Sequence, residues 1–168
     1  DLMPLYGHYE IPKEIMELHQ LEEQLQKDGL SFELIGFQPL RELYTYSMTP
    51  PDSIPFAHTG GAGIHFAFLT DFGQVNSLQE APIICVSPTN DPPIRYVARN
   101  LREFLQLVVA VLHAEMLEQF WGYKDEAMMN REIEEFLHDS PADWTKNRQA
   151  VHARFKEAFD LQPLSFLS

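Results

Sequence analysis

The chain has 168 residues, of which 45% are hydrophobic, and a formal net charge of −13 at pH 7. This size and apolar content are enough for one buried core, so we predict a single domain over residues 1–168. The charge repels phosphate backbones and anionic lipids, which argues against binding nucleic acid or membrane through a basic patch. It permits a basic protein partner, although carboxylates that serve only solubility explain the same composition.

A single cysteine, Cys85, excludes an intrachain disulfide and predicts a reducing compartment. It lies in an apolar run, residues 81–86, which favours a buried inert thiol over a nucleophile. The longest apolar stretch, residues 101–117, is interrupted by polar and charged side chains and predicts a core helix, not a membrane span. Since residues 1–4 show no signal-peptide pattern, we expect a cytoplasmic protein.

The first half of the chain predicts one helix followed by strands. Residues 12–28 form an amphipathic helical pattern with Pro12 in the first turn and Gly29 just beyond the end. Its apolar stripe consists of Ile11, Ile15, Leu18, Leu21 and Leu25. Residues 31–37 predict a strand, residues 41–48 fit either period, and further strands are expected near residues 54–58, 64–70, 82–87 and 94–98. Their close spacing favours antiparallel pairing.

The second half predicts helices. Asn100 and Glu103 resemble a capping box, which opens a helix that carries apolar residues as far as Phe120. Further helices are expected from about Lys124 to His138 and from Ser140-Pro141 onward; Trp144, Val151, Phe155 and Phe159 make the buried stripe of the last one. The predicted fold class is therefore α+β: an N-terminal helix, a mostly antiparallel sheet of about four to six strands, flanking helices and a C-terminal helical extension over residues 121–168.

Several short motifs resemble catalytic or ligand-binding signatures but lack the residues that complete them. Gly60-Gly61-Ala62-Gly63 has no P-loop lysine and no dinucleotide spacing, so we predict a hairpin turn and no cofactor. Asp71-Phe72-Gly73 occurs without the other kinase motifs and also predicts a turn. His113-Ala114-Glu115 matches half of a zinc deaminase signature, but the two cysteines of the other half are missing.

Two histidines are the only weak metal candidates. His58 and His65 flank the predicted glycine turn and could meet at a metal ion together with Asp71 or Asp52. This spacing is unspecific, and histidines beside strands are more often hydrogen-bonded structural residues. We therefore predict no metal site, with a metal-dependent enzyme that uses His58, His65 and Asp71 as the third-ranked hypothesis.

Acidic residues concentrate late in the chain. Residues 103–143 hold ten acidic side chains against Lys124 and Arg131. A solvated helix face explains this excess most simply, and an acidic docking face for a basic protein is the alternative.

Three segments resemble the SMI1/KNR4 (SUKH) superfamily: Ile54-Pro55-Phe56-Ala57 with the glycine turn, Pro82 to Val86, and Val97 to Leu107. The resemblance covers about residues 11–120. It implies an α+β domain without catalytic residues that acts by protein binding, in bacteria mostly as an immunity protein against toxins, many of them nucleases. The acidic composition suits a basic nuclease domain as partner.

The sequence thus predicts a non-enzymatic protein-binding domain, with an immunity protein that neutralises a cognate toxin as the first hypothesis. The expected contact surface is made by the loops around Asp52, Asp71, Glu80 and Asp91. The second hypothesis is a regulatory or scaffold domain that forms a homodimer through Trp144, Phe155 and Phe159.

Overall fold

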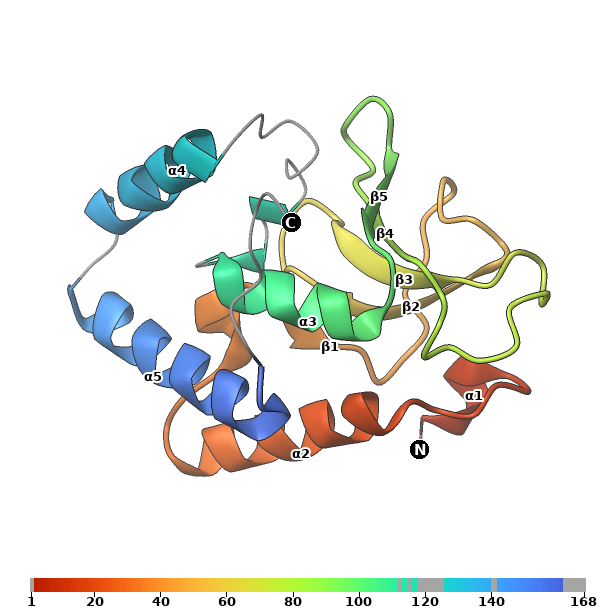
Figure 1. Cartoon of the computed structure of the whole chain (residues 1–168), viewed down its shortest axis with the longest axis horizontal. Coiled ribbons are helices and arrows are strands. Elements are labelled where there is room, and N and C mark those ends of the chain that lie inside the picture. Colours follow the sequence, from red (N-terminus) through yellow and green to blue (C-terminus); the bar gives the residue numbers. More distant parts are fainter. Residues whose placement is uncertain (1, 112, 115, 118–125, 140–141, 162–168) are drawn as a thin grey trace.

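The computed structural model confirms an α+β fold (Figure 1). It describes all residues except 1, 112, 115, 118–125, 140–141 and 162–168. The elements in chain order are α1 (Met3–Tyr6), α2 (Lys13–Lys27), a 3₁₀ helix η1 (Phe32–Ile35), β1 (Gln38–Pro39), β2 (Ser53–His58), β3 (His65–Leu69), β4 (Ile83–Val86), β5 (Ile94–Ala98), α3 (Leu101–Ala110), α4 (Glu126–His138) and α5 (Ala142–Phe159). None of the described helices is long and apolar enough to cross a membrane.

The five strands form one antiparallel meander in the order β1-β2-β3-β4-β5. Strands β2 to β5 lie where the sequence predicts them, because each apolar run is bounded by Gly- or Pro-containing turns. Along β3, Phe66 and Phe68 point into the main core, whereas Ala67 belongs to a small cluster with Ile84 and Val86 on the other face. The long β1–β2 connection covers this second face with Met48.

Helix α3 packs across the main face of the sheet (Figure 1). The ring of Phe104 contacts Phe56 and Phe66 at centroid distances of 5.4 and 4.9 Å. The Asn100 side chain accepts a hydrogen bond from the Glu103 backbone N–H at 2.9 Å, which confirms the predicted N-cap. The helix ends earlier than expected, at Ala110, because Val111 is extended; the predicted continuation to Phe120 is wrong at this point, and Phe120 itself lies outside the described residues.

The predicted strand over residues 31–37 is wrong. Ser31 accepts a hydrogen bond from the Glu33 N–H at 3.1 Å and so caps the 3₁₀ helix η1. Gly36 then ends η1 with a left-handed φ of +63°, and a Cβ at this position would overlap the His113 ring. A local cap and a glycine thus replace the pairing that the apolar pattern suggested. The ambiguous segment 41–48 forms neither helix nor strand.

The C-terminal helix α5 contributes to the main core. Val151, Phe155 and Phe159 are buried as predicted, and the Phe155 ring contacts Phe32 and Phe37 at 6.0 Å each. The prediction that Trp144 is buried in the same stripe is wrong, since its side chain is 55% exposed. Because Phe155 and Phe159 are buried inside the chain, they are not available for the homodimer contact expected of them. The predicted cap at Ser140 and Pro141 lies outside the described residues.

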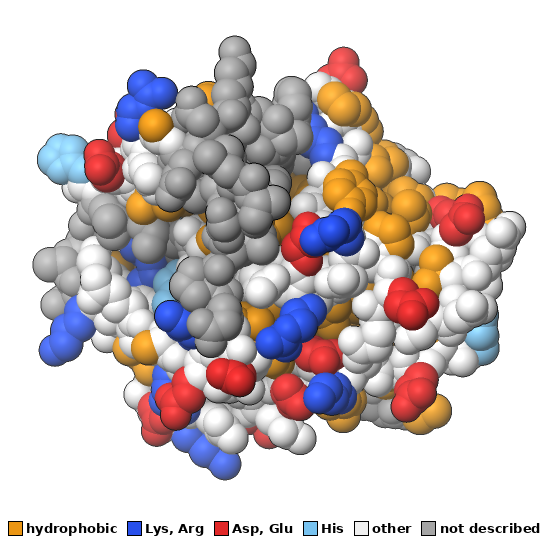
Figure 2. Space-filling model, viewed as in Figure 1, with side chains coloured by type: hydrophobic (Ala, Val, Ile, Leu, Met, Phe, Trp, Pro, Cys, Tyr) orange, Lys and Arg blue, Asp and Glu red, His pale blue; other side chains and the backbone are white. Residues whose placement is uncertain are grey.

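Charged side chains are mixed on the face that α3 covers. Figure 2 shows acidic and basic side chains interspersed there, with apolar side chains gathered towards β5. On α4, Glu132, Glu134 and Glu135 are exposed. Helix α4 lies on the left of Figure 1, whereas α1 and the β3–β4 loop lie on the right, so these carboxylates and those of the sheet loops belong to separate surfaces.

Candidate protein-binding site

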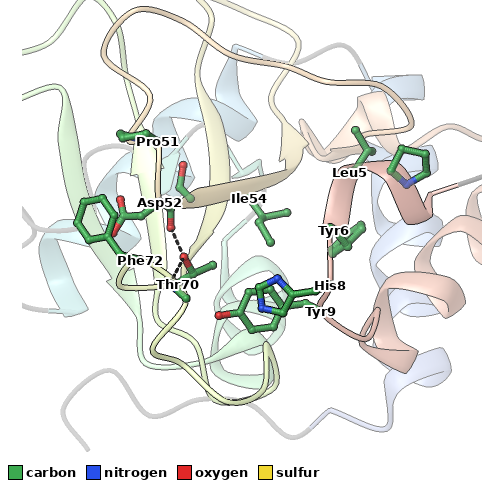
Figure 3. A pocket seen from close by; sticks show the side chains of 13 residues that line it. Leu5, Tyr6, His8, Tyr9, Pro51, Asp52, Ile54, Thr70 and Phe72 are labelled. Carbon is green, nitrogen blue, oxygen red and sulfur yellow. Dashed lines mark hydrogen bonds between the residues drawn. The ribbon is translucent and has the colours of Figure 1, made fainter.

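A pocket of about 450 Å³ opens at the end of the β2–β3 hairpin where β2 begins and β3 ends (Figure 3). One wall is made by α1 and the turn after it, with Leu5, His8 and Tyr9. The opposite wall is made by the start of β2 and the turn after β3, with Asp52 and Phe72. The pocket therefore joins the N-terminal segment to the two strands of the hairpin.

Three successive residues after β3 have left-handed backbone conformations. The φ angles of Asp71, Phe72 and Gly73 are +52°, +54° and +84°. Asp and Gly tolerate this region, but a bulky aromatic residue there is strained by about 1–3 kcal/mol. Phe72 is nevertheless 77% exposed, so burial of its ring within the chain offsets little of that strain. The fold thus holds an apolar ring out into solvent at an energetic cost.

Hydrogen bonds fix this turn on the hairpin. The backbone N–H and the side-chain O–H of Thr70 both donate to the Asp52 carbonyl, at 2.8 and 2.7 Å. The Thr70 hydroxyl in turn accepts from the Gly73 N–H at 3.3 Å, and the Gln74 N–H donates to the Asp71 carbonyl at 3.1 Å. Phe72 is therefore presented by a braced turn, which limits the entropy that a contact with it would cost.

The wall made by α1 and the turn after it is hydrogen-bonded to the β3–β4 loop. The Tyr9 hydroxyl donates to the Val75 carbonyl at 2.8 Å, and the His8 and Tyr9 rings lie 4.3 Å apart. These contacts hold the His8 and Tyr9 side chains on the pocket wall that faces Thr70, whereas the Phe72 ring points outward on the other side (Figure 3). The site combines a rigid apolar projection with an adjacent hollow, which suits the burial of a partner side chain.

Of the four acidic residues expected at the contact surface, the structure places three at one end of the sheet and one at the other. Asp52 precedes β2, Asp71 follows β3, and Glu80 lies in the β3–β4 loop, so all three lie at the Phe72 end of the sheet. Asp91 lies in the β4–β5 loop and therefore at the opposite end. Three of the four predicted residues therefore lie on one surface, and Asp91 does not belong to it.

The opposite end of the hairpin holds His58 and His65 next to each other. They are register partners across β2 and β3, and Tyr44 contacts both rings at centroid distances of 5.1 and 5.2 Å. His65 is fully buried: its Nδ1–H donates to the Gly63 carbonyl at 2.8 Å, and its Nε2 lies 3.1 Å from the Thr49 hydroxyl. His58 Nδ1 accepts from the Gly60 N–H at 3.1 Å.

These contacts contradict the expected meeting of the histidines with Asp52 or Asp71. The carboxylates lie at the other end of the hairpin, because β2 and β3 separate them from the glycine turn. Within the described residues no three His, Cys, Asp or Glu side chains are grouped for a metal ion. Burial lowers the pKa of both histidines, which keeps them neutral and hydrogen-bonded. Their geometry is that of a structural cluster.

The Thr49 hydroxyl links this cluster to the β1–β2 connection. It accepts from the Tyr46 N–H at 2.8 Å and donates to His65 Nε2. A Thr49→Val substitution leaves a buried acceptor unpaired and should lower the free energy of unfolding by about 1–2 kcal/mol in urea titrations. Thr45→Val, at an exposed position of the same segment, is the control and should change little. Equal effects of the two substitutions would contradict the assigned hydrogen bond.

The sequence predicts Asp52 and Asp71 at this surface, but it does not predict Phe72, His8 and Tyr9. The Asp71-Phe72-Gly73 tripeptide predicts only a turn, which the structure confirms. The available signal was the aromatic residue in the middle of a turn, where polar residues or glycine are usual. His8 and Tyr9 carry no such signal, because their place on the wall that faces Thr70 depends on the path of the chain after α1.

Searches of protein-family models, curated proteins and solved structures find no match to this chain.

Proposed function

We propose that this chain is a non-catalytic protein-binding domain that contacts a basic partner at the Phe72 end of the sheet. The observation that carries the proposal is Phe72 itself, an exposed aromatic side chain in a strained left-handed conformation beside a pocket of about 450 Å³. Strained residues persist where function requires their position. Aromatic anchors beside a hollow are also the usual energetic centres of protein interfaces.

Charge defines the kind of partner. Asp71 and Glu80 are exposed and Asp52 is partly exposed at this end of the sheet, and the whole chain carries a net charge of −13. An acidic rim around an apolar anchor favours a surface rich in Lys and Arg, because opposite potentials speed association and disfavour wrong partners.

A narrower proposal is that the chain is a SUKH-type immunity protein and the partner a toxin, with a basic nuclease domain as the expected class. The resemblance of residues 54–66, 82–86 and 97–107 supports it, and the antiparallel sheet with flanking helices is compatible with the fold that this resemblance implies. Carboxylates on the immunity protein would then compete for a surface built to hold phosphates.

Site-specific photocrosslinking tests the contact surface. Benzoylphenylalanine at position 72 should capture a basic protein in the cells that produce this chain, because the Phe72 ring lies at the centre of the proposed contact. The matched control is the same group at Leu43, which is 74% exposed on the β1–β2 connection and outside the site. Identical capture from both positions would contradict the proposed surface.

Two experiments with the captured protein then test the role of charge in binding and the immunity role. Replacing both Asp52 and Asp71 with lysine should slow association about tenfold at low salt, with a smaller effect at high salt. If the narrower proposal is right, the captured protein kills cells when expressed alone and is tolerated when co-expressed with this chain. A captured partner without toxicity would contradict the immunity role and leave the binding surface standing.

A further inference from the structure

A second hollow of about 500 Å³ lies between the start of the chain and α2, away from the Phe72 turn. Its walls include Leu2, Met3, Ile11 and Met16, and its polar side chains include His19 and Arg41. Met3 and Met16 are 66% and 45% exposed, so two of the exposed apolar side chains of the molecule gather at this one hollow. Apolar side chains grouped at a hollow mark a binding surface more often than scattered ones do.

His19 is the unusual residue of this hollow. It is only 6% exposed, and neither of its ring nitrogens has a hydrogen-bond partner among the described residues. A neutral imidazole offers one donor and one acceptor, and leaving a buried polar group unpaired lowers the stability of the fold. Burial and the nearby Arg41 charge lower the pKa of His19 to about 4, so the ring is neutral at pH 7. Because both ring nitrogens are buried, a ligand that brings a donor pairs with the unprotonated one only after the ring turns it towards the hollow.

The charges at the rim restrict that ligand. Arg41 lies 3.2 Å from the Glu22 carboxylate and 3.9 Å from that of Glu23, so its positive charge is already balanced. A ligand carboxylate in this hollow would meet Glu23 beside an arginine that is already paired, which disfavours an anion. A neutral hydroxyl has no such conflict. It donates to the acceptor nitrogen of His19 without bringing a charge into a buried place.

The two thioethers restrict the ligand further. Methionine sulfur makes favourable contacts with aromatic rings, and its flexible side chain adapts to their shape. An aromatic body between Met3 and Met16 with a hydroxyl directed at His19 satisfies both features of the hollow. We propose that this hollow binds a phenol group, either of a small phenolic compound or of a tyrosine side chain. This hollow is distinct from the pocket beside Phe72, although α1 lines both, with Met3 here and Leu5 there.

The test compares 4-ethylphenol with ethylbenzene by nuclear magnetic resonance titration of the whole chain. The phenol should bind saturably, shift the His19 ring signals and bind about tenfold more tightly than ethylbenzene, because only the phenol has the hydroxyl that pairs with His19. In the His19→Phe variant that difference should vanish, while the free energy of unfolding at pH 7 stays the same or rises. Equal binding of the two probes to the natural chain, or no binding of either at millimolar concentration, would overturn the proposal.

A second variant keeps the test valid if His19→Phe does not fold. Met16→Glu places a charge at the half-exposed rim and should abolish phenol binding without unfolding the chain. Tyr96→Ser, an exposed aromatic replaced on β5, is the matched control and should bind as the natural chain does. Unchanged binding in Met16→Glu would exclude this hollow. Capped tripeptides with a central Tyr or Phe identify the source: a Tyr peptide that binds more tightly than 4-ethylphenol indicates a protein ligand, and weaker binding a small molecule.

Discussion

Replacing Phe155 with alanine should lower the free energy of unfolding by about 4 kcal/mol, the usual range for removing a fully buried aromatic ring. Phe155 has no exposed surface, and its ring contacts Phe32, Phe37 and Phe159. The substitution therefore opens a cavity where α5, η1 and the start of β1 meet. Guanidinium titration followed by circular dichroism measures the loss.

Trp144→Ala on the same helix is the matched control. The Trp144 side chain is larger than that of Phe155 but 55% exposed, so its removal should change the free energy of unfolding by less than about 1 kcal/mol. If α5 were a separate appendix, Phe155→Ala would leave the main transition unchanged. Such a result would contradict the assignment of α5 to the main core.

The second large effect is a loss of stability in mild acid. Burial lowers the pKa of His19 and His113 to about 4, below the value of 6.5 that a histidine has in an unfolded chain. The folded state thus binds fewer protons, and the stability is fully present above pH 6.5 and falls as the pH drops towards 4. For His19 alone the loss is about 2 kcal/mol at pH 5.

Urea titrations at pH 7.5 and pH 5 check this slope. His58 and His65 add to it in the same direction, because burial lowers their pKa values as well. In the His19→Phe variant the pH dependence between 7.5 and 5 should be shallower by the His19 share. A variant with the same slope as the natural chain would show that His19 is not held neutral in the folded state.

Local sequence patterns predicted most of the elements; one error comes from a local cap at Ser31, and another from the extent of the core near Trp144. Strands β2 to β5 and helix α2 follow from alternating or helical apolar patterns between clear breakers. Residues 31–37 look equally apolar, but the Ser31 cap and the left-handed Gly36 favour a 3₁₀ turn. Trp144 fits the helical period of α5 but is exposed. The sequence does not predict this, because it does not show how far the neighbouring core extends.

The candidate site was predictable only in part, because its arrangement depends on the strand order and on backbone angles. Loops at the two ends of a meander alternate along the chain, so the pairing that brings Asp52, Asp71 and Glu80 together also places Asp91 elsewhere. This follows once the strand order is known, and the sequence alone does not supply that order. The strain at Phe72 depends on backbone angles, and the unpaired nitrogens of His19 depend on what surrounds α2.

If Phe72 is kept for binding at the expense of stability, as we propose, a comparison of Phe72→Gly with the natural chain will separate the two effects. Glycine relieves the left-handed strain, so the free energy of unfolding should stay the same or rise by up to about 1 kcal/mol. Affinity for the protein captured at position 72 should fall at least a hundredfold, as for an interface anchor. A variant that loses stability and binds its partner as well as the natural chain would contradict the account.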